Sequence, residues 1–150
     1  MTDISYKDGV LTVARVYDAP REDVFDAWVE TNKVQQWWGC AQTTKVCSEI
    51  EPHVGGKYIH MMTIEGAGEF PGGGILTEYD PPSSLAFVSE NPQMNMKNHV
   101  RVTFENQDGK TLVTLTHDGL PDEMSEIVRG GWTAAFEKLA KLLAGSSLAA

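Results

Sequence analysis

The C-terminal segment from Pro121 to Leu143 limits the possible folds more than any other part of the sequence. Pro121-Asp122-Glu123 places a proline and two acidic residues where a helix would begin, and Lys138 and Lys141 lie where it would end. A helix of about 23 residues, roughly 35 Å long, is therefore expected. Its apolar residues recur at helical spacing in one broad stripe: Met124, Ile127, Val128, Gly131, Trp132, Ala135, Phe136, Leu139, Leu142 and Leu143.

A helix with so wide an apolar face needs a large surface to cover it, and the strand-rich middle of the chain offers one. Residues 42–118 alternate short β-type runs with turn-forming residues, which is the pattern of a meander of hairpins. The glycine-rich segment 66–74 is interpreted as a loose hairpin and strand entry. The expected strands are 10–17, 43–50, 57–64, 73–79, 85–89, 100–106 and 111–117.

Two short helices are expected between the first strand and the meander. Asp18 is a candidate N-cap for a helix over 21–28, and a second helix is expected over 33–38, ended by Gly39. The order of elements predicts an α+β helix-grip fold, in which a curved antiparallel sheet of six or seven strands wraps around the long C-terminal helix. We expect one domain over residues 1–150, with its core at about 10–144.

Charge and segment composition exclude several classes of function. Twelve basic residues against 21 acidic ones give a net charge of −9, which repels nucleic-acid phosphates. No stretch approaches the ~18 apolar residues of a membrane span, and the N-terminus has no signal-peptide pattern. We therefore expect no nucleic-acid partner, no membrane insertion and a cytoplasmic location.

No cofactor is expected from the motifs of the chain. Cys40, Cys47, His53 and His60 do not have the short spacing of a zinc site, and the two cysteines are interpreted as free thiols. The run 109–111 is interpreted as part of a hairpin and not as a phosphate-binding loop. No residue is assigned a catalytic role, because no nucleophile elbow is present. A histidine and a carboxylate in one cavity would still allow acid–base chemistry, so enzyme status stays open.

Short motifs spread over residues 10–144 together resemble the START-like (SRPBCC) superfamily, in the branch of the C-terminal domain of the activator of Hsp90 ATPase. The motifs are Arg15-Val-Tyr-Asp-Ala-Pro20, Val24-Phe-Asp-Ala-Trp28, Trp37-Trp38-Gly39, Gly55-Gly56-Lys-Tyr58, Glu78-Tyr-Asp-Pro-Pro82, Leu85-Ala-Phe87, Leu115-Thr-His117 with Gly119-Leu120, and Gly130-Gly131-Trp132. The chain departs from the branch at Cys40, where a proline usually follows the Trp-Trp-Gly group. The resemblance implies a helix-grip fold with an internal pocket, and places Trp37-Trp38-Gly39 at its end.

The candidate ligand-binding residues follow from strand alternation and from the glycine pair of the last helix. Alternation places His60 and Met62 on one strand face, which we expect to point inward. Gly130-Gly131 either permits close packing against Trp38 or a strand, or leaves room for a ligand. Met94 and Met96 are candidates for a pocket lip. The predicted ligand-binding residues are Trp38, His60, Met62, Phe87, Val102, His117, Val128, Gly131, Trp132 and Ala135.

The leading functional hypothesis is that the chain binds a small lipophilic molecule between the sheet and the C-terminal helix, as a carrier or sensor. One alternative, implied by the resemblance, is a polyketide-cyclase-like or hydrolase-like enzyme that uses the same cavity. Another is an interaction module for the Hsp90 chaperone. A homodimer is left open.

Overall fold

The sheet of this protein has eight antiparallel strands in the order β1-β2-β8-β7-β6-β5-β4-β3. The computed structural model describes residues 2–91 and 96–149, and among these the side chains of 2–90 and 97–144. The strands are β1 Asp3–Lys7, β2 Val10–Tyr17, β3 Thr43–Ile50, β4 Lys57–Ile64, β5 Gly68–Asp80, β6 Ser84–Asn91, β7 Met96–Gln107 and β8 Lys110–His117. Met94, one of the two residues expected at the pocket lip, lies outside the described residues.

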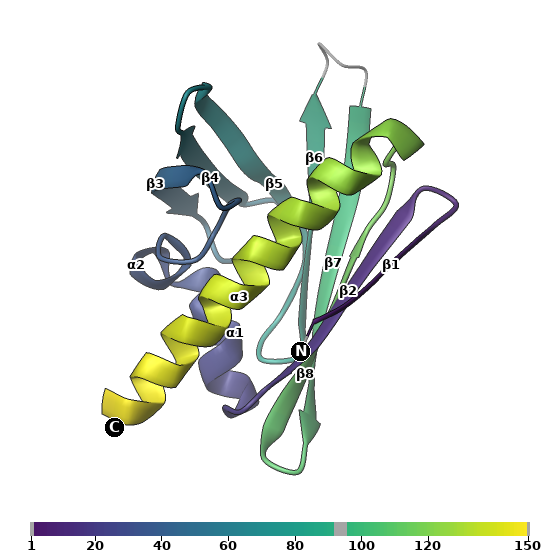
Figure 1. Ribbon diagram of the computed structural model, residues 1–150. Helices are drawn as coiled ribbons and strands as arrows, with labels where there is room; N and C mark the ends of the chain where they lie inside the picture. The colour runs from purple at the N-terminus through teal and green to yellow at the C-terminus, as the bar shows by residue number, and fades with distance from the viewer. Residues whose placement is uncertain (1, 92–95, 150) are drawn as a thin grey trace.

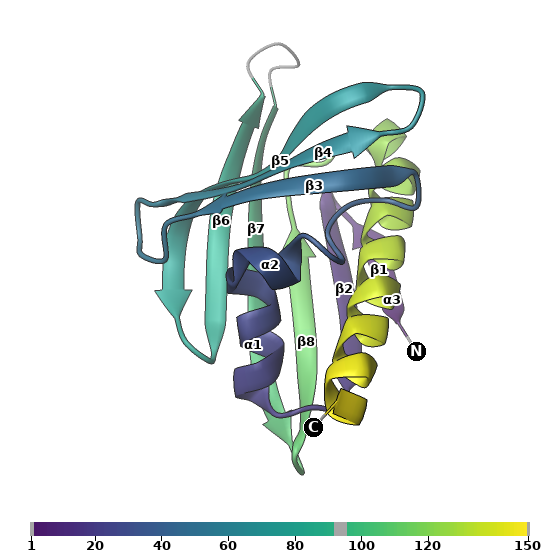
Figure 2. The same cartoon turned by 90° about the vertical axis from the view of Figure 1, so that its left-hand side faces the viewer.

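The long helix α3 (Ser125–Ala149) runs diagonally across the concave side of this sheet (Figure 1). A short 3-10 turn, η1 (Asp122–Met124), precedes it. The helices α1 (Arg21–Val29) and α2 (Thr31–Val34) lie on the same side of the sheet beside α3, and β3, β4 and the outer part of β5 bend over them (Figure 2). The helices of the described residues include none with the length and apolar content to cross a membrane.

The predicted helix-grip fold is confirmed, with one strand more than the six or seven expected. The additional strand is β1, which pairs with β2 from Asp3↔Ala14 to Lys7↔Val10. Its short sequence, DISYK, alternates only two apolar residues, Ile4 and Tyr6, with polar ones. An edge strand with so few apolar residues gives little signal of its own and is defined by the hairpin that it forms with β2.

Three local predictions were wrong. The strand expected over 73–79 begins earlier: β5 starts at Gly68 and its residues 68–75 pair with β4, so most of the segment interpreted as a loose hairpin and strand entry is already strand. Asp18 does not cap α1; Pro20 occupies the N-cap position, and its carbonyl accepts the Val24 N–H at 3.1 Å. The helix α2 spans Thr31–Val34 and not 33–38.

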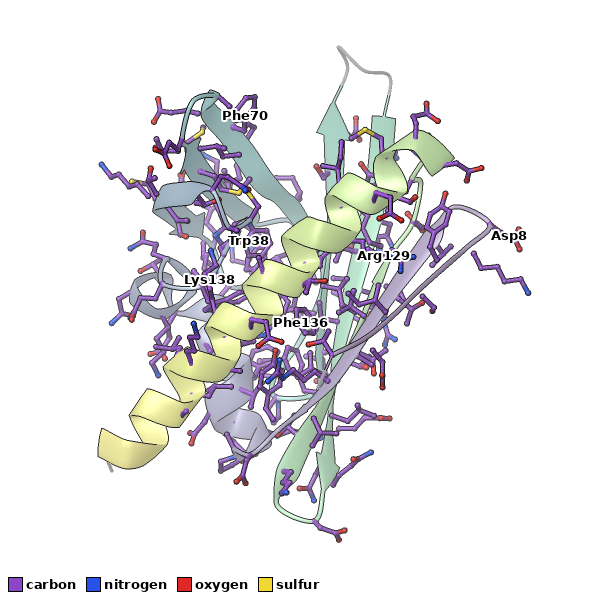
Figure 3. The ribbon with its side chains drawn as sticks, in the orientation of Figure 1. Asp8, Trp38, Phe70, Arg129, Phe136 and Lys138 are labelled. Atoms are coloured by element: carbon purple, nitrogen blue, oxygen red, sulfur yellow. The ribbon has the colours of Figure 1, made fainter. Side chains whose placement is uncertain are left out.

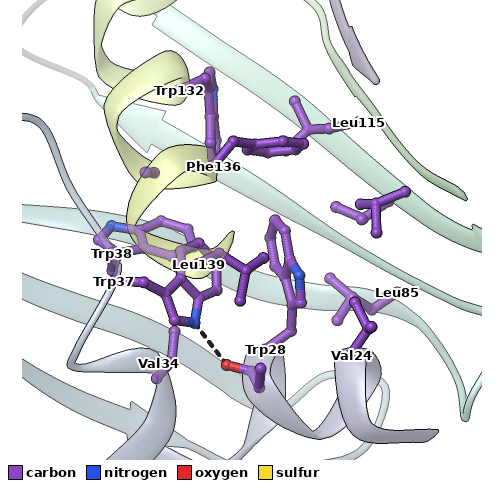
Figure 4. Packing of buried hydrophobic residues seen from close by; sticks show 14 of the residues in the cluster. Val24, Trp28, Val34, Trp37, Trp38, Leu85, Leu115, Trp132, Phe136 and Leu139 are labelled. Atoms are coloured by element: carbon purple, nitrogen blue, oxygen red, sulfur yellow. Dashed lines mark hydrogen bonds between the residues drawn. The ribbon is translucent and has the colours of Figure 1, made fainter. Parts of the chain in front are cut away.

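The C-terminal half of α3 packs into an aromatic core centred on Trp28. The ring of Trp28 lies 4.5 Å from that of Trp37 and 6.2 Å from that of Phe136, measured between centroids. Figure 4 shows these side chains with Leu139, which α3 also directs into the core. Edge-to-face pairs of this kind add stabilisation beyond the area that they bury.

Buried hydrogen bonds fix the helices to this core. Trp37 Nε1 donates to the Ala27 carbonyl at 2.8 Å, and Tyr58 Oη donates to the Trp28 carbonyl at 2.7 Å. Tyr17, on β2, donates to the Phe136 carbonyl at 3.0 Å and so connects the sheet to α3. Each bond satisfies a polar group that burial removes from water.

Truncating Leu139 to alanine should lower the free energy of unfolding by about 2–5 kcal/mol, because its side chain is 0% exposed and a cavity would replace it. The matched change on the same helix, Ile127→Ala, should alter stability by only about 0.5 kcal/mol, since Ile127 is 69% exposed. Urea unfolding of both variants measures the difference. Equal losses would show that α3 does not pack on the sheet through the Leu139 side of the helix.

Candidate functional site

A cavity of about 320 Å³ lies between the sheet and α3, near the helix's N-terminal half. Three parts of the chain line it. The helix contributes Ile127, Val128, Gly131, Trp132 and Ala135, and the segment after α2 contributes Trp38, Gly39 and Cys40. The sheet contributes Met62 and Ile64 from β4, Gly72 and Gly73 from β5, Phe87 and Ser89 from β6, Asn98 and Val100 from β7, and His117 from β8.

Two indoles form the inner wall of the cavity. The ring centroid of Trp38 lies 5.4 Å from that of Trp132, and the two planes are nearly perpendicular. Trp38 comes close to the sheet because Gly72 has no side chain: a Cβ there would lie 2.7 Å from Trp38 Nε1. A larger residue at position 72 would displace the indole, so Gly72 sets the position of this wall.

Lys138 fixes the loop that carries Trp38. Its Nζ donates to the carbonyl oxygens of Trp38 at 3.2 Å and of Cys40 at 3.3 Å. Figure 3 labels the side chains of Lys138 and Trp38 beside α3. Burial lowers the pKa of Lys138, while Cys40 opposes that shift. The ammonium group therefore joins α3 to the turn after α2 at the edge of the cavity.

Cys40, in the same loop, is one of the residues that line the cavity. Burial opposes its ionisation, but the Thr43 hydroxyl, backbone groups of Gln42 and of Cys40 itself, and the Lys138 charge together lower the pKa of the thiol. Its Sγ lies 3.5 Å from Thr43 Oγ1. Cys40 and Cys47 are both free.

His117 and Trp132 form a hydrogen-bonded pair on the sheet side of the cavity. Trp132 Nε1 donates to His117 Nδ1 at 3.0 Å. An indole N–H can only donate, so Nδ1 must be unprotonated, and the neutral ring carries its proton on Nε2. Burial lowers the pKa of His117 to about 4, with Asp118 opposing the shift, so the ring is neutral at pH 7.

The structure shows the surroundings of the glycine pair in α3. A Cβ built on Gly130 or on Gly131 would meet nothing within 4 Å. Close packing against Trp38 or a strand, one of the two alternatives from the sequence, is therefore wrong at these positions. Gly131 borders open space in the cavity, whereas Gly130 faces outward and is exposed.

Eight of the ten predicted ligand-binding residues line the cavity: Trp38, Met62, Phe87, His117, Val128, Gly131, Trp132 and Ala135. His60 and Val102 do not. Val102 is fully buried and pairs with Leu85 and Leu115, deeper in the core than the cavity. His60 points inward as expected, but the Trp38 ring covers it, with 4.2 Å between the ring centroids.

Strand alternation already contained a signal for most of the lining residues that the sequence analysis missed. Ile64 continues the face of Met62, Ser89 continues that of Phe87, and Asn98 and Val100 continue that of Val102. Ile127 follows from the helical stripe. Gly39 was expected at the end of the pocket from the resemblance, whereas Cys40, Gly72 and Gly73 gave no signal, because loop conformation and the approach of Trp38 place them at the cavity.

His60 is a buried histidine with only one hydrogen bond among the described residues. Its Nδ1 lies 2.8 Å from Ser48 Oγ, while Nε2 is buried and has no partner in this part of the chain. Burial lowers the pKa of His60 to about 3, well below the ordinary value of 6.5. The charged form of this ring is therefore strongly disfavoured in the folded state.

Comparison with known proteins identifies a family and a set of similar folds. The sequence model of the family described as activator of Hsp90 ATPase homolog 1-like protein matches residues 18–144. No curated protein sequence matches the chain.

Solved structures from several bacteria have the same fold at low sequence identity. Protein NE0264 from Nitrosomonas europaea superimposes with a TM-score of 0.81 at 15% identity, over 95% of this chain and 99% of that one. A protein from Arthrobacter aurescens gives 0.79 at 20% identity, over 95% and 91% of the two chains. Protein Ms6760 from Mycobacterium smegmatis gives 0.76 at 20% identity, over 95% and 96%.

Stability should fall as the pH decreases from about 6.5 toward 4, because unfolding frees His60 and His117 to bind protons that they exclude in the folded state. Well above pH 6.5, from about pH 7.5, both states are neutral at these rings, and the two histidines contribute no pH dependence. Each adds a slope of up to about 1.4 kcal/mol per pH unit within that window.

The variant His60→Asn isolates one of these contributions, since asparagine keeps a polar atom near Ser48 but does not titrate. The free energy of unfolding, measured in urea between pH 7 and 4.5, should depend less steeply on pH in the variant, by about one bound proton. Identical slopes in the two proteins would mean that His60 titrates normally in the folded state.

Proposed function

This chain belongs to the activator of Hsp90 ATPase homolog 1-like family, and from that premise we propose that it binds a small hydrophobic molecule between the sheet and α3. The helix-grip fold of this family commonly binds hydrophobic ligands. The cavity of about 320 Å³ is within the size range of small-molecule sites, and most of its lining is apolar.

The observation that supports this proposal most directly is the open space at Gly131. A glycine inside a helix costs about 1 kcal/mol relative to alanine, and in a filled core the absent side chain would be replaced by a close neighbour. Here no atom outside the neighbouring backbone of α3 itself lies within 4 Å of the position that a Cβ would occupy. Gly130 has the same open surroundings but is exposed, whereas Gly131 lines the cavity, so the space beside Gly131 is where a ligand would be accommodated.

The lining favours binding over acid–base catalysis. Among the described residues that line the cavity there is no carboxylate, and His117 is the one histidine. With a pKa of about 4, His117 is a weak base at neutral pH. Its hydrogen bond to Trp132 also occupies the nitrogen that would accept a proton.

Replacing Gly131 with leucine should block the cavity without damaging the fold. The new side chain would project into open space, so affinity for the apolar dye Nile red should fall at least about tenfold. Helix propensity should raise the free energy of unfolding by up to about 1 kcal/mol. Dye titration and urea unfolding measure the two effects.

Gly130→Leu is the matched control, because it makes the same helical substitution one residue away on an exposed position that does not line the cavity. This variant should gain similar stability and keep the affinity of the wild type for Nile red. Equal affinities in the two variants would contradict the proposed site, as would a Gly131→Leu protein destabilised by the ~1–3 kcal/mol typical of an overpacked core.

A further inference from the structure

The polar side chains on the sheet side of the cavity are gathered in one patch. Ser89 on β6 lies directly opposite Asn98 on β7, and His117 on β8 lies opposite Val100, two residues further along β7 on the same face. All three polar residues line the cavity. The sheet therefore presents an apolar cavity with one polar corner, and a molecule that fills it meets both kinds of surface.

The hydrogen bonds around this corner fix the orientation of its groups. Asn98 Nδ2 donates to the Asp118 carbonyl at 2.9 Å, and the Asp118 carboxylate accepts the His99 backbone N–H at 2.7 Å. The carboxylate next to His117 in sequence is thus engaged on the backbone of β7. Trp132 occupies His117 Nδ1, so the proton of the neutral ring is on Nε2.

The Nε2–H group of His117 remains available to a ligand. No group in the described part of the chain makes a hydrogen bond to Nε2, and this nitrogen is not among the buried atoms that lack a partner. His117 is one of the residues that line the cavity. A hydrocarbon ligand in contact with His117 would remove water from the N–H without offering it an acceptor, and the lost hydrogen bond would reduce the affinity. A ligand with an acceptor at this point avoids that loss.

The charge of the surroundings selects an uncharged acceptor. No lysine, arginine, aspartate or glutamate side chain lines the cavity among the described residues. Lys138 directs its ammonium group to the carbonyl oxygens of Trp38 and Cys40 instead. A carboxylate ligand at the polar corner would lose its hydration with no counter-charge among the described residues that line the cavity, and the protein's net charge of −9 would repel it further.

We propose that the ligand is a neutral, largely apolar molecule with a carbonyl group, and that His117 recognises this group through its Nε2–H. The proposal rests on the proposed function and adds the chemical class of the ligand. In this assignment Trp132 is a positioning residue, because its hydrogen bond to Nδ1 determines which nitrogen of His117 carries the proton.

Three naphthalenes of similar shape test the proposal by displacement of Nile red: 2-acetylnaphthalene, 2-ethylnaphthalene and 2-naphthoate. The acetyl compound should bind about fivefold to tenfold more tightly than the ethyl compound, the value expected of one hydrogen bond, and the naphthoate should bind most weakly. In His117→Leu the preference for acetyl over ethyl should disappear. In His99→Leu, the same change on the opposite face of the sheet, it should remain.

A measurement on the wild type makes the test independent of how the variants fold. Long-range ¹H–¹⁵N spectra should show His117 as the tautomer protonated on Nε2, and adding 2-acetylnaphthalene should shift the Nε2 resonance. A ring protonated on Nδ1 overturns the proposal.

The outcomes also separate this proposal from the proposed function. Equal binding of the acetyl and ethyl compounds, or tightest binding of the naphthoate, refutes carbonyl recognition and leaves hydrophobic ligand binding intact. If neither Nile red nor any naphthalene binds, both proposals fail.

Discussion

The structure depends on how one helix meets the concave side of the sheet. From its middle onward, α3 buries Phe136, Leu139 and Leu143 in the aromatic core around Trp28, and Tyr17 on β2 donates a hydrogen bond to the Phe136 carbonyl. In its N-terminal half the residues that face the sheet include Gly131 and Ala135, whose small or absent side chains fill little space. The same helix is therefore anchored at one end and leaves a cavity at the other. Dense packing and an open site meet at Trp132 and Ala135, which line the cavity and also belong to the core cluster.

The walls of the cavity are formed by the loop after α2, the sheet and the N-terminal half of α3. Gly72 lets Trp38 approach β5, and Lys138 holds the loop of Trp38 to α3. Trp132 contacts both the loop and the sheet, since its ring lies beside that of Trp38 and its N–H donates a hydrogen bond to His117 on β8. The cavity thus follows from interactions that also stabilise the fold, and its polar corner is held by hydrogen bonds that do not involve any ligand. A site of this kind is largely formed before a ligand enters.

Much of the fold could be predicted from the sequence because two periodicities dominate it. The strands Thr43–Ile50 and Lys57–Ile64 begin and end where alternation and turn residues indicated. The apolar stripe after Pro121 indicated the long helix, although α3 begins at Ser125, after the 3-10 turn η1, and not at Pro121. The early part of β5 could not be predicted in this way, since its glycines resemble a loop until pairing with β4 extends them. At the site, alternation showed that His60 and Met62 share one face of β4, but not how deeply each side chain is buried beneath the cavity. Only the folded chain shows that Trp38 covers His60 while Met62 borders the cavity, because this depends on contacts between distant segments.

The central claim is that an apolar molecule enters the space between α3 and the sheet. Intermolecular NOEs between 2-ethylnaphthalene and the methyl groups of ¹³C-labelled protein test it most directly, because they locate the molecule whatever its affinity for a polar group. The account predicts NOEs to Ile64, Val100 and Val128, which line the cavity from β4, β7 and α3. NOEs confined to Val16 and Val54, which are exposed and do not line it, would place the compound on the outer surface and contradict the account.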